Sequence, residues 1–198
     1  PVAKEIYVLE SERFPNNDGK TKVAKQLHND LNGSSDFLVI SGYGGLGEII
    51  DVISSSAKDC EDIRLLFGHE INLKNSRKSR RKKMIQMEMK DYWIKRKLSP
   101  IQHASVVEVI ERLESGLIKV RMADDTPRLH AKMYRTRASI IFGSSNFTYP
   151  GLHTSREMNQ RHSRPSDEYN ELSKYMESVW ELGTDCTEFI LSLLDQLL

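Results

Sequence analysis

The sequence contains a continuous apolar run, Phe37–Ile40, between segments rich in serine and glycine. A short run with no polar residue is typical of a strand that is covered on both faces of a sheet. Apolar residues at helical spacing precede it over residues 20–31 and follow it over residues 46–53. Because helix and strand alternate along the chain, the sequence predicts an α/β domain with helices on both faces of its sheet.

Further apolar periods extend this pattern to the end of the chain. Strands are expected over residues 6–9, 63–67, 118–122, 129–134 and 139–142, and helices over residues 76–97, 106–117, 166–183 and from residue 185 onward. The last helix is expected to open on a capping box formed by Asp185 and Glu188. The polar link 135–137 makes the strands on either side of it a hairpin, so the sheet is predicted to be mixed. No internal repeat is visible, and residues 1–198 are expected to form one domain.

Charge is distributed unevenly along the chain. The formal net charge is +1, but residues 74–97 contain 11 Lys or Arg and only 2 acidic residues. Such segregation is typical of a surface that binds polyanions, although a solvated helix face is the commoner origin of a charge run. The candidate nucleic-acid contacts in this segment are Arg77, Lys78, Arg80, Arg81, Lys82 and Lys83.

Several classes of protein are disfavoured by composition. No apolar run approaches the roughly 18 residues that a membrane helix needs, and no signal-peptide core is present, so we expect a cytoplasmic protein with no membrane association. Cys60 and Cys186 are not in a CxxC pair and are expected to be free thiols. No acidic cluster suggests a bound metal, and no cofactor is expected.

The residues with the clearest chemical content lie between positions 128 and 159. Side chains two apart on a strand share a face, so His130 and Lys132 are expected to point the same way while Leu129, Ala131 and Met133 point into a core. The turn Gly143-Ser144-Ser145-Asn146 follows the next strand of the hairpin and is expected to reach the same place. Together these residues predict a phosphate-binding site.

Each part of this site has a use in the cleavage of a phosphodiester. A neutral imidazole is nucleophilic enough to attack phosphorus when an acceptor orients its other nitrogen, and Glu157 is the candidate acceptor for His130. Lys132, Ser144 and Asn146 would donate to the equatorial oxygens, which gather charge in the transition state. Since the cations are side chains, the chemistry is expected to be independent of metal ions.

These residues resemble the signature of the phospholipase D superfamily, in which HxK is followed by an aspartate and then by a GSxN turn. The form seen at Arg128–Lys132 and Gly143–Thr148, with Gly151 spaced from Glu157, is similar to that of the nuclease branch, which includes metal-independent restriction endonucleases and helicase-associated domains. The chain departs from the pattern at Arg137, where the full motif has the aspartate.

The resemblance implies a mechanism and a set of partners. His130 would form a phosphohistidine, and a second histidine would protonate the leaving oxygen and then activate water. Family sites use two copies of the motif whereas this chain has one, so a homodimer with His130 from each subunit is implied. DNA is the expected substrate, with a fused or associated helicase or restriction subunit as a further partner.

The sequence is also compatible with two other functions. The domain is alternatively a non-catalytic module that holds DNA for a helicase or restriction enzyme. A lipid-acting phosphodiesterase is the third hypothesis, and the basic run disfavours it. The glycine-rich segment Gly42–Gly47 lacks the spacing of a nucleotide-binding loop, and we interpret it as a turn that lets the chain pass close to the site. His153 lies near the motif and is a candidate substrate contact.

Overall fold

A seven-stranded mixed sheet forms the centre of the computed structural model, which describes residues 9–18, 20–68, 100–123 and 128–195. The strand order is β6-β5-β4-β1-β2-β3-β7. The strands are β1 (Asp36–Ser41), β2 (Asp62–Phe67), β3 (Ile118–Ala123), β4 (Lys132–Thr136), β5 (Ser139–Gly143), β6 (Asn159–Ser163) and β7 (Gly183–Asp185). β1, β2 and β3 run parallel, and every other neighbouring pair is antiparallel. The predicted α/β class and mixed sheet are therefore confirmed.

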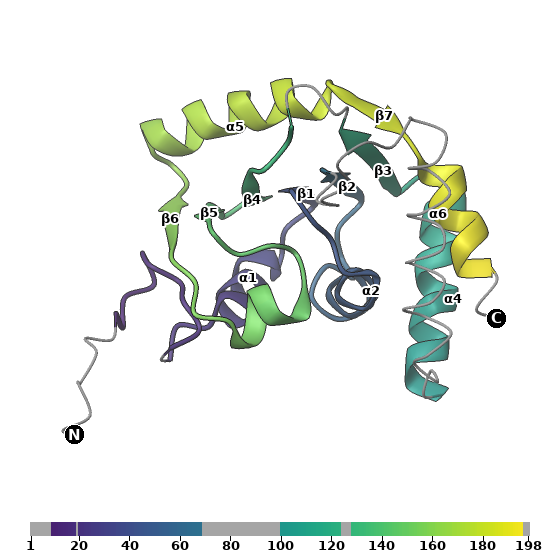
Figure 1. The fold of residues 1–198 in the computed structure, drawn as a ribbon, viewed down its shortest axis with the longest axis horizontal. Coiled ribbons are helices and arrows are strands. Elements are labelled where there is room, and N and C mark those ends of the chain that lie inside the picture. The colour runs from purple at the N-terminus through teal and green to yellow at the C-terminus, as the bar shows by residue number, and fades with distance from the viewer. Residues whose placement is uncertain (1–8, 19, 69–99, 124–127, 196–198) are drawn as a thin grey trace, which may run out of the picture.

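Helices cover the sheet on both faces, as Figure 1 shows. Helices α1 (Val23–Leu31), α2 (Leu46–Ser55), α4 (Pro100–Glu114) and α6 (Thr187–Leu194) contribute to one hydrophobic core, and α5 (Asp167–Trp180) contributes to the other. The central strand serves both cores, because Phe37 and Val39 lie in the first and Leu38 and Ile40 in the second. Burial on both faces explains why the strand has no polar residue between Asp36 and Ser41.

The ends of several elements differ from the expectation. β4 begins at Lys132 rather than at residue 129, so His130 precedes the strand. The capping box predicted for α6 is wrong in position: Cys186 is the N-cap residue, and Asp185 ends β7 while its Oδ1 accepts a hydrogen bond from Thr187 N at 2.9 Å. The expected hairpin is confirmed by the pairing of Tyr134 with Ile141. The expected helix over 76–97 lies outside the described residues, as does most of the expected strand 6–9.

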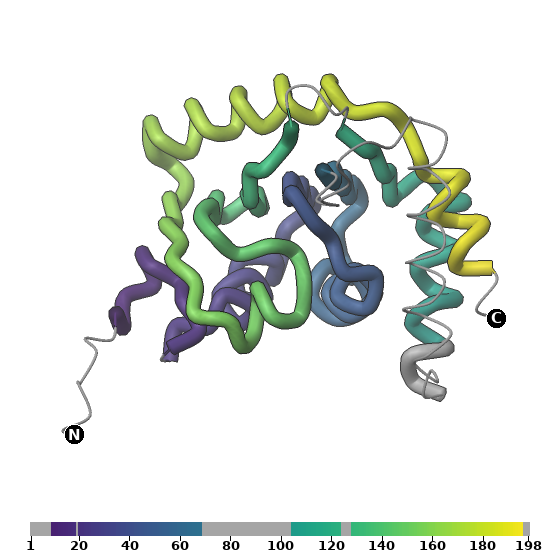
Figure 2. Tube along the Cα trace, viewed as in Figure 1, coloured from purple at the N-terminus to yellow at the C-terminus, as the bar shows by residue number. Residues whose placement is uncertain are grey.

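Three elements are additional to the expectation. β6 and β7 are the two edge strands of the sheet, and a π-helical turn covers Pro150–Thr154. Figure 2 shows the N-terminal segment 9–18 (purple) beside the green tube that leads through this turn to β6. Arg161 N donates to Arg13 O at 2.9 Å, so the outer edge of β6 is covered in part by the segment 9–18.

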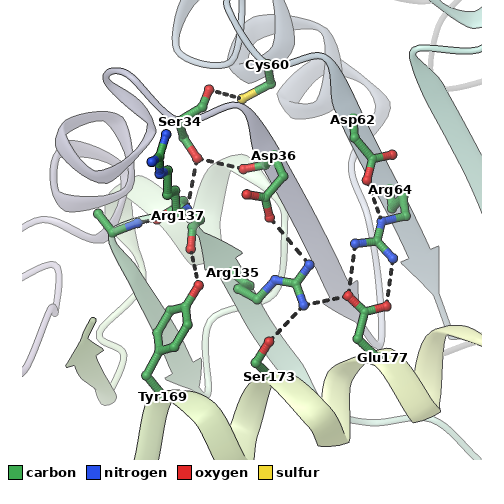
Figure 3. Close-up of polar contacts among 12 residues, drawn as sticks. Ser34, Asp36, Cys60, Asp62, Arg64, Arg135, Arg137, Tyr169, Ser173 and Glu177 are labelled. Atoms are coloured by element: carbon green, nitrogen blue, oxygen red, sulfur yellow. Dashed lines mark hydrogen bonds and ion pairs between the residues drawn. The ribbon is translucent and has the colours of Figure 1, made fainter. Parts of the chain in front are cut away.

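An ion network attaches α5 to the sheet (Figure 3). Glu177 accepts from Arg64 at 2.7 Å and 3.0 Å and from Arg135 at 2.6 Å. Arg135 also lies 3.4 Å from Asp36 and donates to Ser173 at 3.0 Å. The Arg135 side chain is only 8% exposed, so its charge depends on these acceptors. The hydrogen bond from Arg64 is the largest of several effects that lower the pKa of Glu177 to about 2.

Acid should weaken this attachment in a predictable pH range. The folded pKa of Glu177, about 2, is below its ordinary value of 4.5, so the stabilisation is complete above pH 4.5 and is lost as the pH falls toward 2. Because the Glu177 side chain is 43% exposed, screening reduces the effect, and we expect Glu177→Gln to lower the free energy of unfolding by roughly 1–2 kcal/mol at pH 7. Urea denaturation of both proteins between pH 2 and 7 measures this. Equal destabilisation by Glu177→Gln at pH 2 and pH 7 would contradict the assignment.

Candidate active site

His130 and Lys132 are in contact, as their spacing predicted. Lys132 Nζ lies 3.0 Å from His130 Nδ1 and 3.2 Å from Nε2, and it donates to the His130 carbonyl at 2.7 Å. Lys132 is buried whereas the His130 ring is exposed. On the other side of the segment, Met133 is buried in the core against α5, with Leu129 and Ala131 packed on it. The pair therefore presents an exposed imidazole with a cation held beside it.

The segment that carries His130 crosses the carboxyl ends of two parallel strands. Gly42, which follows β1, donates from its N to Ala131 O at 2.9 Å, and a Cβ on it would lie 3.4 Å from both His130 Cα and Lys132 Nζ. Gly68 follows β2, and a Cβ there would come within 3.0 Å of Leu129 O. A side chain at Gly68 would therefore clash with the segment, whereas one at Gly42 would only touch it. The carboxyl ends of parallel strands are where α/β sheets bind ligands.

The turn after β5 brings Ser144 and Glu157 together. Ser144 Oγ donates to Glu157 Oε2 and accepts from Met158 N at 2.9 Å, while Ser144 N donates to Met158 O at 3.1 Å. A Cβ on Gly143 would come within 3.0 Å of Met158 O and of Asn159. The acceptor role of Glu157 toward His130 stays a prediction, since the hydrogen bond observed for its carboxylate comes from Ser144.

The turn is also held by hydrogen bonds from two buried residues, Asn159 and Tyr134, which the sequence analysis did not identify as part of the site. Asn159 is 1% exposed; its Nδ2 donates to Ser145 Oγ and to Pro15 O, each at 2.9 Å, and its Oδ1 accepts from Ser145 N at 3.3 Å. Tyr134 donates from its hydroxyl to Ser145 O, and burial raises the pKa of Tyr134 well above its ordinary value. The turn is thus anchored to the segment 9–18 and to β4.

Asn146 lies in the same turn with an unsatisfied acceptor. Within the described residues its Oδ1 is buried and has no hydrogen-bond partner. The backbone of Asn146 packs against Gly151, where a Cβ would come within 3.0 Å of Asn146 O and N. Buried polar atoms are almost always paired, so an unpaired Oδ1 at this position is unusual.

The glycine-rich segment passes close to the site, as interpreted from the sequence. Gly45 N donates to Phe147 O at 2.8 Å, and Gly44 forms a β-bridge with Phe147. Ser41 Oγ accepts from Phe147 N at 3.1 Å and donates to Tyr43 O at 2.7 Å. The segment after β1 and the turn after β5 are therefore joined next to Asn146.

Other predicted residues lie elsewhere. Arg137 is in the link between β4 and β5, where its N donates to Ser34 Oγ at 2.9 Å (Figure 3). It lies five positions after Lys132, about 16 Å along the strand, so its charge is remote from the site. The predicted nucleic-acid contacts over 77–83 lie outside the described residues. His153, a candidate substrate contact, pairs with Glu48 at 2.8 Å.

The described residues contain no group of three or more His, Cys, Asp or Glu side chains placed to hold a metal ion. None of the helices in these residues has the length and apolar character needed to cross a membrane.

Comparison with known proteins decides the family. Residues 37–180 match the family described as "Cardiolipin synthase, PLD-like domain", a match that spans more than half of the chain and includes the His130 and Asn146 motifs. The chain belongs to this PLD-like domain family. No curated protein matches the sequence.

Solved structures share the fold of this PLD-like domain. Nuc from Salmonella typhimurium, a phospholipase D family member, has a TM-score of 0.55 at 13% identity, with 87% of this chain and 95% of that chain covered. NucT from Helicobacter pylori has a TM-score of 0.50 at 11% identity, covering 82% and 89%. Phosphatidylserine synthase from Haemophilus influenzae Rd KW20 has a TM-score of 0.58 at 9% identity, covering 92% of this chain and 44% of that one.

The close packing of Gly151 on Asn146 can be tested through protein stability. Gly151→Ala should displace the turn and lower the free energy of unfolding by roughly 1–3 kcal/mol. The added Cβ would clash with backbone atoms of Asn146, which cannot move aside as a flexible side chain could. Gly45→Ala is the matched control, because its Cβ would meet Thr148 at an ordinary 3.5 Å, and we expect a loss below about 1 kcal/mol. Thermal denaturation compares the two. Equal stability of the two variants would show that the packing is not tight.

Proposed function

We propose that this PLD-like domain is a metal-independent phosphodiesterase that cleaves DNA through a phosphohistidine at His130. The observation that carries the proposal is the 3.0 Å contact between Lys132 Nζ and the exposed His130 ring at the carboxyl ends of β1 and β2. An imidazole beside a buried ammonium combines a nucleophile with a charge that attracts phosphate.

The proposed chemistry consists of two displacements at phosphorus. A nitrogen of His130 attacks, the P–N bond forms, and the P–O bond to the leaving oxygen breaks as a second histidine protonates it. Water then attacks the phosphohistidine while that second histidine accepts its proton, and the P–N bond breaks. No oxidant or metal ion takes part.

The other site residues are assigned to charge stabilisation and orientation. Lys132 Nζ and Nδ2 of the Asn146 carboxamide donate to the equatorial oxygens. Ser144 joins them when its hydroxyl, which donates to Glu157 in the structure, turns toward the phosphate. Glu157 holds Ser144 through Oε2, and its second oxygen is the acceptor proposed for the His130 ring. The remoteness of Arg137 supports activity, because the missing motif aspartate would also lie away from the reacting atoms.

The proposal is tested by cutting DNA in EDTA. We expect the native chain to cut, His130→Ala to lose at least roughly 10³-fold in rate, and Lys132→Ala to lose roughly 10²–10³-fold. Arg137→Ala is the matched control and should cut at the native rate, since it removes a cation from the far end of β4. A requirement for added Mg²⁺ would contradict the histidine mechanism. Salt-sensitive binding with no cutting would support the non-catalytic module instead.

We further propose that the second histidine comes from a second copy of the chain in a homodimer. The activity per native chain should then fall when native chains are co-refolded with an excess of His130→Ala, because mixed dimers carry one histidine at the shared site. Analytical ultracentrifugation with an activity assay on each species checks the assembly. A monomer with full activity would exclude the shared site.

DNA is proposed as the substrate on the basis of the basic segment 74–97 and the phosphodiester chemistry. A helicase or restriction subunit is the proposed partner from the resemblance of the motif to the nuclease branch.

A further inference from the structure

Exposed apolar side chains gather around the proposed phosphate site. The described residues expose six large hydrophobic side chains: Tyr43, Leu117, Tyr149, Met158, Tyr175 and Leu182. Three of the six belong to the segments that build the site. Tyr43 follows Gly42, Tyr149 follows the turn of Asn146, and Met158 is next to Glu157. Three exposed apolar side chains on the segments that build the site are candidate contacts for a ligand bound there.

Tyr43 and Tyr149 lie on two segments that are joined beside the site. Gly42 is packed against His130 and Lys132, so Tyr43 is one residue from the proposed phosphate position. The bridge between Gly44 and Phe147 brings the turn before Tyr149 to the same segment. The two rings are 48% and 55% exposed.

The ring of Tyr149 stacks on a histidine that is hydrogen-bonded to a buried glutamate. It stacks on the ring of His153 with centroids 4.6 Å apart and an interplanar angle of 16°. His153 Nε2 lies 2.8 Å from Oε1 of Glu48, whose side chain is 3% exposed. Burial raises the pKa of Glu48, and its hydrogen bond with His153 acts in the opposite direction. A carboxylate buried to fix one imidazole, which in turn stacks on an exposed tyrosine, forms a pre-ordered aromatic platform.

We propose that Tyr43 and the stacked pair Tyr149–His153 bind nucleobases, and that the substrate strand is unpaired at this site. This inference rests on the proposed function, since the phosphate on His130 and Lys132 brings the neighbouring bases to the rings. Proteins that bind single strands without sequence preference stack the bases on aromatic side chains and contact the phosphates of the strand with cationic ones. A base inside a duplex has both faces covered and offers no surface to stack.

Binding to matched oligonucleotides tests the proposal. The probes are a single-stranded phosphorothioate dT 12-mer, the same backbone with abasic sites in place of the bases, and a duplex of equal length, each measured by fluorescence anisotropy in EDTA. The native chain should bind the single strand at least roughly 10-fold more tightly than the abasic strand of equal charge. Tyr149→Ala should remove most of this preference and leave abasic binding unchanged, whereas Tyr149→Phe should keep it.

Tyr175→Ala is the matched control, because it removes another exposed tyrosine, 52% exposed, from α5 on the opposite face of the sheet. It should bind all three probes like the native chain. Equal native affinity for normal and abasic strands, or tighter binding of the duplex, would overturn the proposal. So would a Tyr149→Ala protein that loses affinity for every probe together with a change of oligomeric state, because the platform would then be a subunit contact.

Failure of the proposed function is a separate result. If base-dependent binding is observed but DNA is not cut in EDTA, the platform stands and the phosphodiesterase proposal fails. If DNA is cut in EDTA while binding ignores the bases, the platform fails and the phosphodiesterase proposal stands.

Discussion

The close approach of the His130 segment to the ends of β1 and β2 is the constraint on which the site depends. Gly68 leaves room for the backbone at Leu129, and Gly42 lies against His130 and Lys132 at the carboxyl end of β1. A hydrogen bond from Gly42 N to Ala131 O holds this segment against the end of β1, directly before β4 begins at Lys132. Lys132 is buried there, and its ammonium meets the imidazole of His130. The pair His130–Lys132 is therefore placed by backbone packing.

The second half of the site is placed by buried polar groups. Asn159 and Tyr134 each form a hydrogen bond with Ser145, and Ser41 Oγ accepts a hydrogen bond from Phe147 N. Ser145 is therefore fixed in position, and Ser144 and Asn146 are its neighbours on either side. A site whose donors are held by a second layer of hydrogen bonds needs little reorganisation when charge develops in the transition state.

The sequence predicted the parts of this arrangement that apolar patterning encodes. The apolar runs Phe37–Ile40 and Leu65–Phe67 were predictable because burial on both faces of the sheet excludes polar side chains from them. Strand alternation predicted that His130 and Lys132 share a face, and the two are in contact although His130 precedes β4. β6 was not predictable, since its sequence Asn-Gln-Arg-His-Ser has no apolar residue. It is held instead by pairing with β5 and by Arg161, which donates to Asp30 at 2.8 Å and 2.7 Å. The link from Asn159 to Pro15 joins residues 144 positions apart, a contact that no local pattern encodes.

The stereochemical course at phosphorus tests the central claim most directly. Each in-line displacement inverts the phosphorus, so a reaction through a phosphohistidine at His130 inverts it twice. A DNA strand with one chiral phosphorothioate at the cut position, cleaved in ¹⁸O-labelled water with EDTA, reports the outcome. The account predicts net retention of configuration. Net inversion would show that water attacks the phosphodiester directly, and it would contradict the covalent role of His130.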